Sequence, residues 1–149
     1  MRKFIVLSII VLMLAGFAIT SSANSTMVLA LLAGKGINVG TLTAEIVGTD
    51  LVVTYEVNAP WVLGETHLYV GTEVPKKSAP GQFPYGPEDA VDSGVYIIPL
   101  AGFGAGPLYI AAHAEVTNPT EEETAWAGWC NSERIRPDKN WATYFTFRR

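Results

Sequence analysis

The sequence has very few cysteines and charged residues. Of its 149 residues only Cys130 is a cysteine, and only 16% are charged. One cysteine cannot form a disulfide within the chain, which excludes the class of small secreted domains that disulfides hold together. No basic run is longer than two residues, as in Lys76-Lys77. Because binding to nucleic acids depends on clustered cationic side chains, we expect no nucleic-acid partner.

The sequence also lacks the motifs of several common enzyme classes. It contains no Gly-x-Ser-x-Gly nucleophile turn, no His-Glu-x-x-His metal motif and no phosphate-binding glycine loop followed by a helical pattern. The absence of these motifs predicts a non-catalytic protein with no catalytic residues. Paired carboxylates among the 14 acidic residues leave glycoside hydrolysis as an open alternative.

The apolar residues, which make up 49% of the chain, are concentrated first at the N-terminus. The basic pair Arg2 and Lys3 precedes an apolar stretch, and small residues follow that stretch up to Ala23. This order is typical of a secretory signal peptide, and the stretch is shorter than the roughly 20 residues of a membrane-spanning helix. We therefore predict a signal peptide at 1–23, a single domain at 24–149, a secreted or cell-surface location and no membrane span after cleavage. An uncleaved membrane anchor is the alternative.

The rest of the sequence shows the alternation of apolar and polar residues that is typical of β-strands. Residues 51–57 alternate most clearly, and Gly48 to Asp50 supply a turn that would join them to Ile37–Val47 in a hairpin. Further strands are predicted at 27–33, 66–70, 95–98, 108–116 and 142–147. No helical periodicity competes with these predictions. The pattern indicates an all-β fold, a single antiparallel β-sandwich of jelly-roll-like type with about seven or more strands.

The first of these strands is uncharged and apolar on both faces, as a fully buried strand would be. It comprises Met27, Val28, Leu29, Ala30, Leu31, Leu32 and Ala33. One interpretation is that it is the first core strand of its own domain. The other is that it completes the sheet of a neighbouring subunit by strand addition. These seven residues, together with a Cys130 that is free to pair between molecules, are the candidate assembly residues.

Two long loops are predicted between the strands, at residues 73–94 and 117–140. Loops of this length are usually functional or disordered, and their aromatic residues argue against disorder. Tryptophan and tyrosine on loops or strand ends form sugar-stacking platforms or protein contacts. The candidate ligand-binding residues are Trp61, Tyr85, Trp126, Trp129 and Trp141. Trp126 and Trp141 have the alternative role of packing the second loop onto the sandwich, whereas Trp129 is the better candidate for an exposed contact.

The two histidines of the chain lie on predicted strands. Glu65 lies two residues before His67 on one strand and so shares a face with it, and His113 lies on another. If the two strands are neighbours, these three residues would form a site for a transition metal such as Zn, Cu or Fe. A hydrogen-bonded polar pair without a metal is the alternative. Calcium is a second candidate ion, with acidic ligands at Glu88, Asp89, Asp92, Glu121, Glu122 and Glu123.

Five segments of the sequence stand out as ordered blocks. They are Glu65-Thr-His-Leu-Tyr-Val-Gly71, Pro80-Gly-Gln-Phe-Pro-Tyr85, Leu108-Tyr-Ile-Ala-Ala-His-Ala114, Glu123-Thr-Ala-Trp126 and Asn140-Trp-Ala-Thr-Tyr-Phe145. Together these blocks resemble an uncharacterised module of secreted and cell-surface proteins of bacteria and archaea. The resemblance spans nearly all of the mature chain except residues 127–138. It implies a location and a fold type rather than a reaction.

These observations predict a non-catalytic extracellular module, structural or adhesive, that acts at the cell surface or in the matrix. One alternative is a self-assembling fibre subunit joined by donor-strand addition, and another is a carbohydrate-binding module. The expected partner is the protein itself, as a homo-oligomer or fibre, or a protein or glycan of the cell surface.

Overall fold

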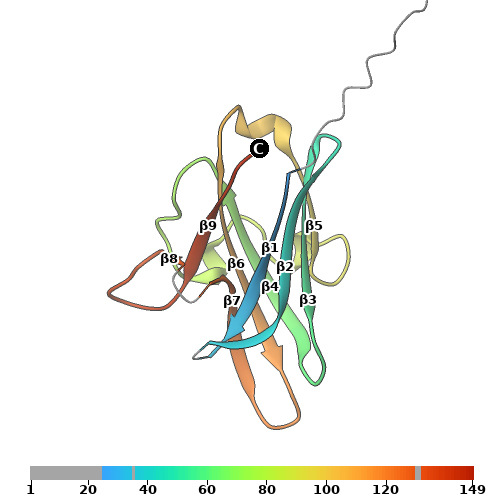
Figure 1. The fold of residues 1–149 in the computed structure, drawn as a ribbon, viewed down its shortest axis with the longest axis vertical. Coiled ribbons are helices and arrows are strands. Elements are labelled where there is room, and N and C mark those ends of the chain that lie inside the picture. Colours follow the sequence, from blue (N-terminus) through green and yellow to red (C-terminus); the bar gives the residue numbers. More distant parts are fainter. Residues whose placement is uncertain (1–24, 35, 130–131) are drawn as a thin grey trace, which may run out of the picture.

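The computed structural model describes residues 25–34, 36–129 and 132–149 (Figure 1). The predicted signal peptide and Cys130 lie outside the described residues. The strands are β1 (Thr26–Ala33), β2 (Ile37–Val47), β3 (Asp50–Val57), β4 (Val62–Gly71), β5 (Val95–Pro99), β6 (Leu108–Thr117), β7 (Glu122–Gly128), β8 (Glu133–Arg134) and β9 (Thr143–Phe147). Three short 3-10 helices are η1 (Pro80–Gln82), η2 (Pro87–Asp89) and η3 (Leu100–Phe103).

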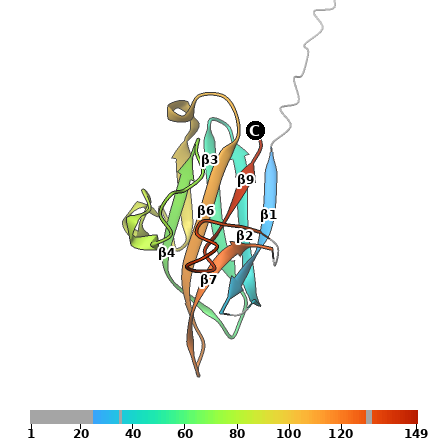
Figure 2. The ribbon, with the colours of Figure 1, turned by 90° about the vertical axis from the view of Figure 1, so that its left-hand side faces the viewer.

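The strands form one curled sheet in which every neighbouring pair is antiparallel. Their order is β5-β3-β2-β1-β7-β6-β9-β8. Strands β7 and β9 pair with different halves of one edge of β6, and β4 pairs with the opposite edge of β6. The curl brings β1, β2, β3 and β5 opposite β4 and β6, so the sheet covers its own core (Figure 2). The prediction of an all-β sandwich is therefore confirmed.

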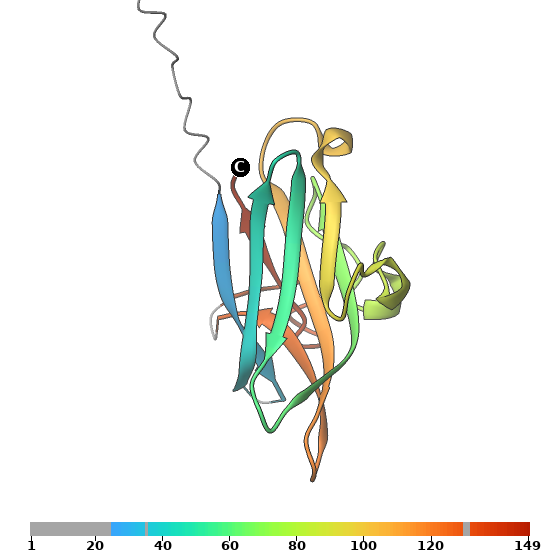
Figure 3. The same cartoon turned by 90° about the vertical axis from the view of Figure 1, so that its right-hand side faces the viewer.

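The hairpin of β2 and β3 is the clearest case of a local pattern that determines structure. The two strands pair from Gly40 opposite Val57 to Val47 opposite Asp50 (Figure 3). Gly48 in the connecting turn has a φ of +62°, a value that favours glycine because it has no Cβ. Alternate residues of both strands face the core, which is the arrangement that the sequence alternation predicts.

The prediction that β1 is buried on both faces was wrong. Leu29, Leu31 and Ala33 are buried in the core, whereas Val28 on the opposite face is 52% exposed. The strand pairs with β2 along one edge and with β7 along the other. On this outer face, Leu32 lines a groove that is described below, whereas Val28 does not.

The prediction of a single loop at residues 117–140 was also wrong. The segment contains β7, which pairs with both β1 and β6 and joins the two layers of the sheet. Ala125 and Ala127 of β7 face the core and are fully buried. Trp126 points to the opposite face, where it joins a second, smaller apolar cluster with Phe83 and Ile135.

The curled sheet is closed at β4 by tyrosine side chains in place of a backbone ladder. The Tyr96 hydroxyl of β5 lies 2.7 Å from Thr66 Oγ1, and it donates to the carbonyl oxygens of Thr66 at 2.9 Å and Gly86 at 3.2 Å. The hydroxyl of Tyr55 donates to the carbonyl oxygen of His67 at 3.0 Å. These bonds connect the two layers where backbone pairing between them is missing from the described strands.

Candidate functional site

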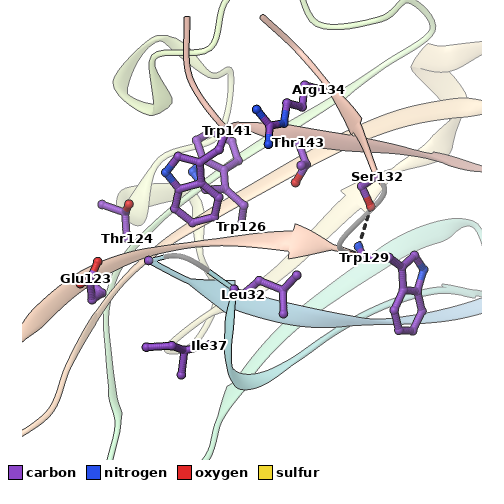
Figure 4. Close-up of a pocket in the computed structure, with 12 residues that line it drawn as sticks. Leu32, Ile37, Glu123, Thr124, Trp126, Trp129, Ser132, Arg134, Trp141 and Thr143 are labelled. Carbon is purple, nitrogen blue, oxygen red and sulfur yellow. Dashed lines mark hydrogen bonds between the residues drawn. The ribbon is translucent and has the colours of Figure 1, made fainter. Parts of the chain in front are cut away.

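A groove lies on the outer face of the sheet, lined by residues of β1, β7 and β9 and of the segments next to them (Figure 4). It has a volume of about 810 Å³, and three of the four tryptophans of the chain line it. We call it the tryptophan groove. Its lining residues are Leu32, Gly34, Gly36, Ile37, Glu123, Thr124, Trp126, Trp129, Ser132, Arg134, Trp141 and Thr143.

The three tryptophans of the groove differ in how firmly they are held. Trp126 lies opposite Leu32 in the pairing of β7 with β1, and only 5% of it is exposed. Trp141, just before β9, is half-buried against the same apolar cluster. Trp129 follows the end of β7 and is 57% exposed, well apart from the other two indoles in Figure 4. The groove thus combines a fixed aromatic wall, formed by Trp126 and Trp141, with the indole of Trp129, which faces solvent.

The aromatic wall is supported from behind by two further rings. Trp126 meets Phe83 edge-on with ring centroids 6.0 Å apart, and it meets His113 with centroids 4.9 Å apart. Phe83 comes from the first predicted loop, which folds over the outer face of β4 and β6 around η1. Edge-to-face contacts of this kind fix the orientation of a ring in addition to burying it.

Polar groups surround the aromatic wall. Ser132 Oγ accepts a hydrogen bond from the backbone N–H of Trp129 at 2.5 Å, and Thr143 Oγ1 donates to the carbonyl of Ala127 at 3.0 Å. The Glu123 carboxylate lies over Gly34, whose φ is +51°. A Cβ at that glycine would approach Glu123 Oε2 to 3.1 Å. The absence of a side chain at Gly34 therefore leaves room for the carboxylate at the groove.

The structure does not bring the other two candidate aromatic residues to this groove. Trp61 and Tyr85 are partly buried and pack against the main core. The backbone of Tyr85 forms a bridge with Leu68 of β4, with N–H to carbonyl distances of 2.9 and 3.2 Å. Trp61 and Tyr85 thus have structural contacts elsewhere, and the tryptophans of the tryptophan groove are Trp126, Trp129 and Trp141.

The two histidines are direct cross-strand neighbours. His67 of β4 lies opposite His113 of β6, with ring centroids 5.8 Å apart. Glu65 lies on the same face as His67, but its side chain is exposed and it does not complete a group of three metal ligands among the described residues. Burial, together with the nearby His67, lowers the pKa of His113 from 6.5 to about 4, so this imidazole is neutral at pH 7.

The acidic calcium candidates lie on two separate segments: one holds Glu88, Asp89 and Asp92 between β4 and β5, and the other holds Glu121 just before β7 with Glu122 and Glu123 at its start. Asp89 Oδ2 accepts the N–H of Gly86 at 2.8 Å, and Asp92 Oδ1 accepts the N–H of Ser93 at 2.7 Å, so both carboxylates cap local turns. Within the described ranges, no group of three or more His, Cys, Asp or Glu side chains is placed to hold a metal ion.

Comparisons with protein-family models, with curated proteins and with solved structures each found no match to this chain. In the described parts of the chain, none of the helices has the length and apolar character needed to cross a membrane.

Proposed function

We propose that the protein is a non-catalytic extracellular adhesive module that binds carbohydrate in the tryptophan groove. The observation that carries the proposal is the placement of Trp126, Trp129 and Trp141 around one open groove. The extracellular location rests on the predicted signal peptide.

The composition of the groove favours a sugar over a purely apolar ligand. A sugar ring has C–H groups that pack on the face of an indole, and hydroxyls around its edge that need both donors and acceptors. The groove offers indole rings together with an acceptor at Glu123, a donor at Arg134 and hydroxyls at Thr124 and Thr143. An aromatic surface with a small number of polar groups that converge on it is typical of small-ligand sites.

The volume of the groove limits what it would hold. About 810 Å³ lies within the 300–1,000 Å³ range of small-ligand sites. The groove is therefore large enough for a short oligosaccharide segment, and we expect it to hold part of a longer glycan chain whose ends continue into solvent.

The proposal is tested by screening the purified protein on a glycan array, followed by calorimetric titration of the best oligosaccharide. We expect Trp129→Ala to lower the affinity at least about tenfold, because stacking of a ring on an exposed aromatic residue is a typical binding hot spot. Trp61→Ala, outside the groove, is the matched control and should leave the affinity unchanged. Absence of any glycan binding, or equal losses in both variants, would reject the proposal.

Self-assembly by donor-strand addition is the competing proposal. In the structure β1 already pairs within its own chain along both edges. Strand exchange would therefore require β1 to leave β2 and β7 before it could join a neighbouring subunit. Light scattering with and without reductant separates a monomer from a strand-mediated polymer and from a dimer linked through Cys130.

A further inference from the structure

The histidine pair lies outside the tryptophan groove but contacts its wall. The Nδ1 atoms of His67 and His113 are both buried, and neither has a hydrogen-bond partner among the described residues. Nearly all buried polar atoms in proteins are paired with protein groups, water or an ion, so each unpaired atom needs an explanation. Two such atoms on adjacent rings point to one shared partner.

We propose that His67 and His113 bind a single copper ion in its monovalent state, Cu(I), through their Nδ1 atoms. Metal–nitrogen bonds of about 2 Å would place two nitrogens on opposite sides of an ion about 4 Å apart, and their ring centres about 6 Å apart. The observed separation of the ring centroids is 5.8 Å. The spacing of the two rings is therefore close to that of two imidazoles that hold one ion between them.

The set of ligands selects the metal. No third His, Cys, Asp or Glu completes a site within the described residues, and Glu65 is exposed beyond the register shift. Zinc needs four ligands, and calcium and magnesium need six or more oxygen atoms. Cu(I) is stable with two ligands in a line, and imidazole is a good copper ligand.

The burial of the pair favours a singly charged ion. His113 is only 5% exposed, and the cost of burying a charge rises with the square of that charge. Both ligands must also be deprotonated to bind a metal. Burial already lowers the pKa of His113 to about 4, so its imidazole needs to lose no proton at neutral pH.

Anaerobic titration of the purified protein with Cu(I), against a coloured Cu(I) chelator, tests the proposal. Ag(I), which has the same charge and does not change oxidation state, serves as a second probe. We expect one ion per chain, in the wild type and equally in Cys130→Ser, which removes the one thiol of the chain. Because Trp126 is 4.9 Å from His113, saturation at one equivalent should quench its fluorescence, and Trp126→Phe should keep the ion while losing most of the quenching.

Variants separate this site from adventitious binding. His67→Gln and His113→Gln should each weaken Cu(I) binding at least about a hundredfold, because the loss even of an outer-shell partner costs 10–100-fold. Glu65→Gln is the control and should bind as the wild type does. His67 is the less buried of the pair, so His67→Gln, checked for folding by near-UV circular dichroism, remains informative if His113→Gln does not fold. No stoichiometric binding, loss of binding in Cys130→Ser, or retained binding in a folded His67→Gln would overturn the proposal.

Discussion

The indole of Trp126 meets the imidazole of His113 edge-on, with ring centroids 4.9 Å apart. Trp126 therefore lines the tryptophan groove and also contacts His113 of the histidine pair. The proposed sugar site and the proposed copper site share this residue, although they are tested by separate probes. An effect of Ag(I) on glycan affinity would measure how strongly the two sites are coupled through it.

Two tryptophans of the groove should differ sharply in their effect on stability. Trp126→Ala removes a side chain that is only 5% exposed, and we expect a loss of about 3–5 kcal/mol in the free energy of unfolding. Trp129→Ala removes a side chain that is 57% exposed and should change it by less than about 0.5 kcal/mol. Urea denaturation measures both values. Equal losses would contradict the placement of the two rings.

The Tyr96 hydroxyl should contribute measurably to closure of the sheet. Tyr96→Phe leaves the carbonyls of Thr66 and Gly86 without this donor in a buried place, so we expect a loss of about 1–3 kcal/mol. Tyr69→Phe is the matched control, since the hydroxyl of Tyr69 bonds to the carbonyl of Glu73 at the surface. Chemical denaturation of both variants should rank Tyr96→Phe as clearly less stable.

Deletion of residues 24–33 distinguishes a core strand from a donated one. The deletion removes Leu29 and Leu31 from the core and takes away the partner of both β2 and β7. Each buried leucine is worth about 2–5 kcal/mol, against a total stability of about 5–15 kcal/mol for a typical domain. We expect the shortened chain to be unfolded by circular dichroism. A folded, soluble monomer would instead support strand donation.

Acid should destabilise the metal-free protein through His113. Its pKa falls from 6.5 to about 4 on folding, so between these values the unfolded chain binds a proton that the folded chain does not. The contribution of neutral His113 to the free energy of unfolding is complete above pH 6.5, and this contribution is lost as the pH falls toward 4. The full shift corresponds to about 3 kcal/mol. Urea titrations with chelator at pH 7 and 4.5 should show the wild type losing about 2 kcal/mol more than a folded His113→Gln, whereas an equal loss would refute this account.

The hairpin of β2 and β3 could be predicted because its information is local. Alternating apolar residues and the turn at Gly48 act within one short segment. β7 could not be recognised in this way, since it begins with the polar residues Glu122 and Glu123. Its strand conformation depends on β1 and β6, which are distant in the sequence. Tertiary pairing therefore outweighs the weak local preference.

The groove and the histidine pair depend on the same non-local pairing. Trp126 and Leu32 meet only once β7 lies beside β1, and the two histidines meet only once β4 lies beside β6. The prediction that Glu65 shares a site with His67 was based on the two residues sharing a face of the strand. The alternation of burial does hold from Glu65 to His67, but the side chain of Glu65 is exposed beside the register shift and joins no group of three metal ligands among the described residues, and sequence alternation alone gives no sign of that shift.

Closure of the sheet at β4 has a consequence for crowded surroundings. An unpaired strand edge acts as a template on which a foreign strand can add, and this is a common route to aggregation. On the free edge of β4 the backbone groups of Thr66 and Leu68 are occupied by Tyr96 and by the bridge to Tyr85. A strand from another molecule would first have to displace these bonds. The tyrosines thus protect this stretch of β4 against uncontrolled intermolecular pairing, as well as connecting the two layers.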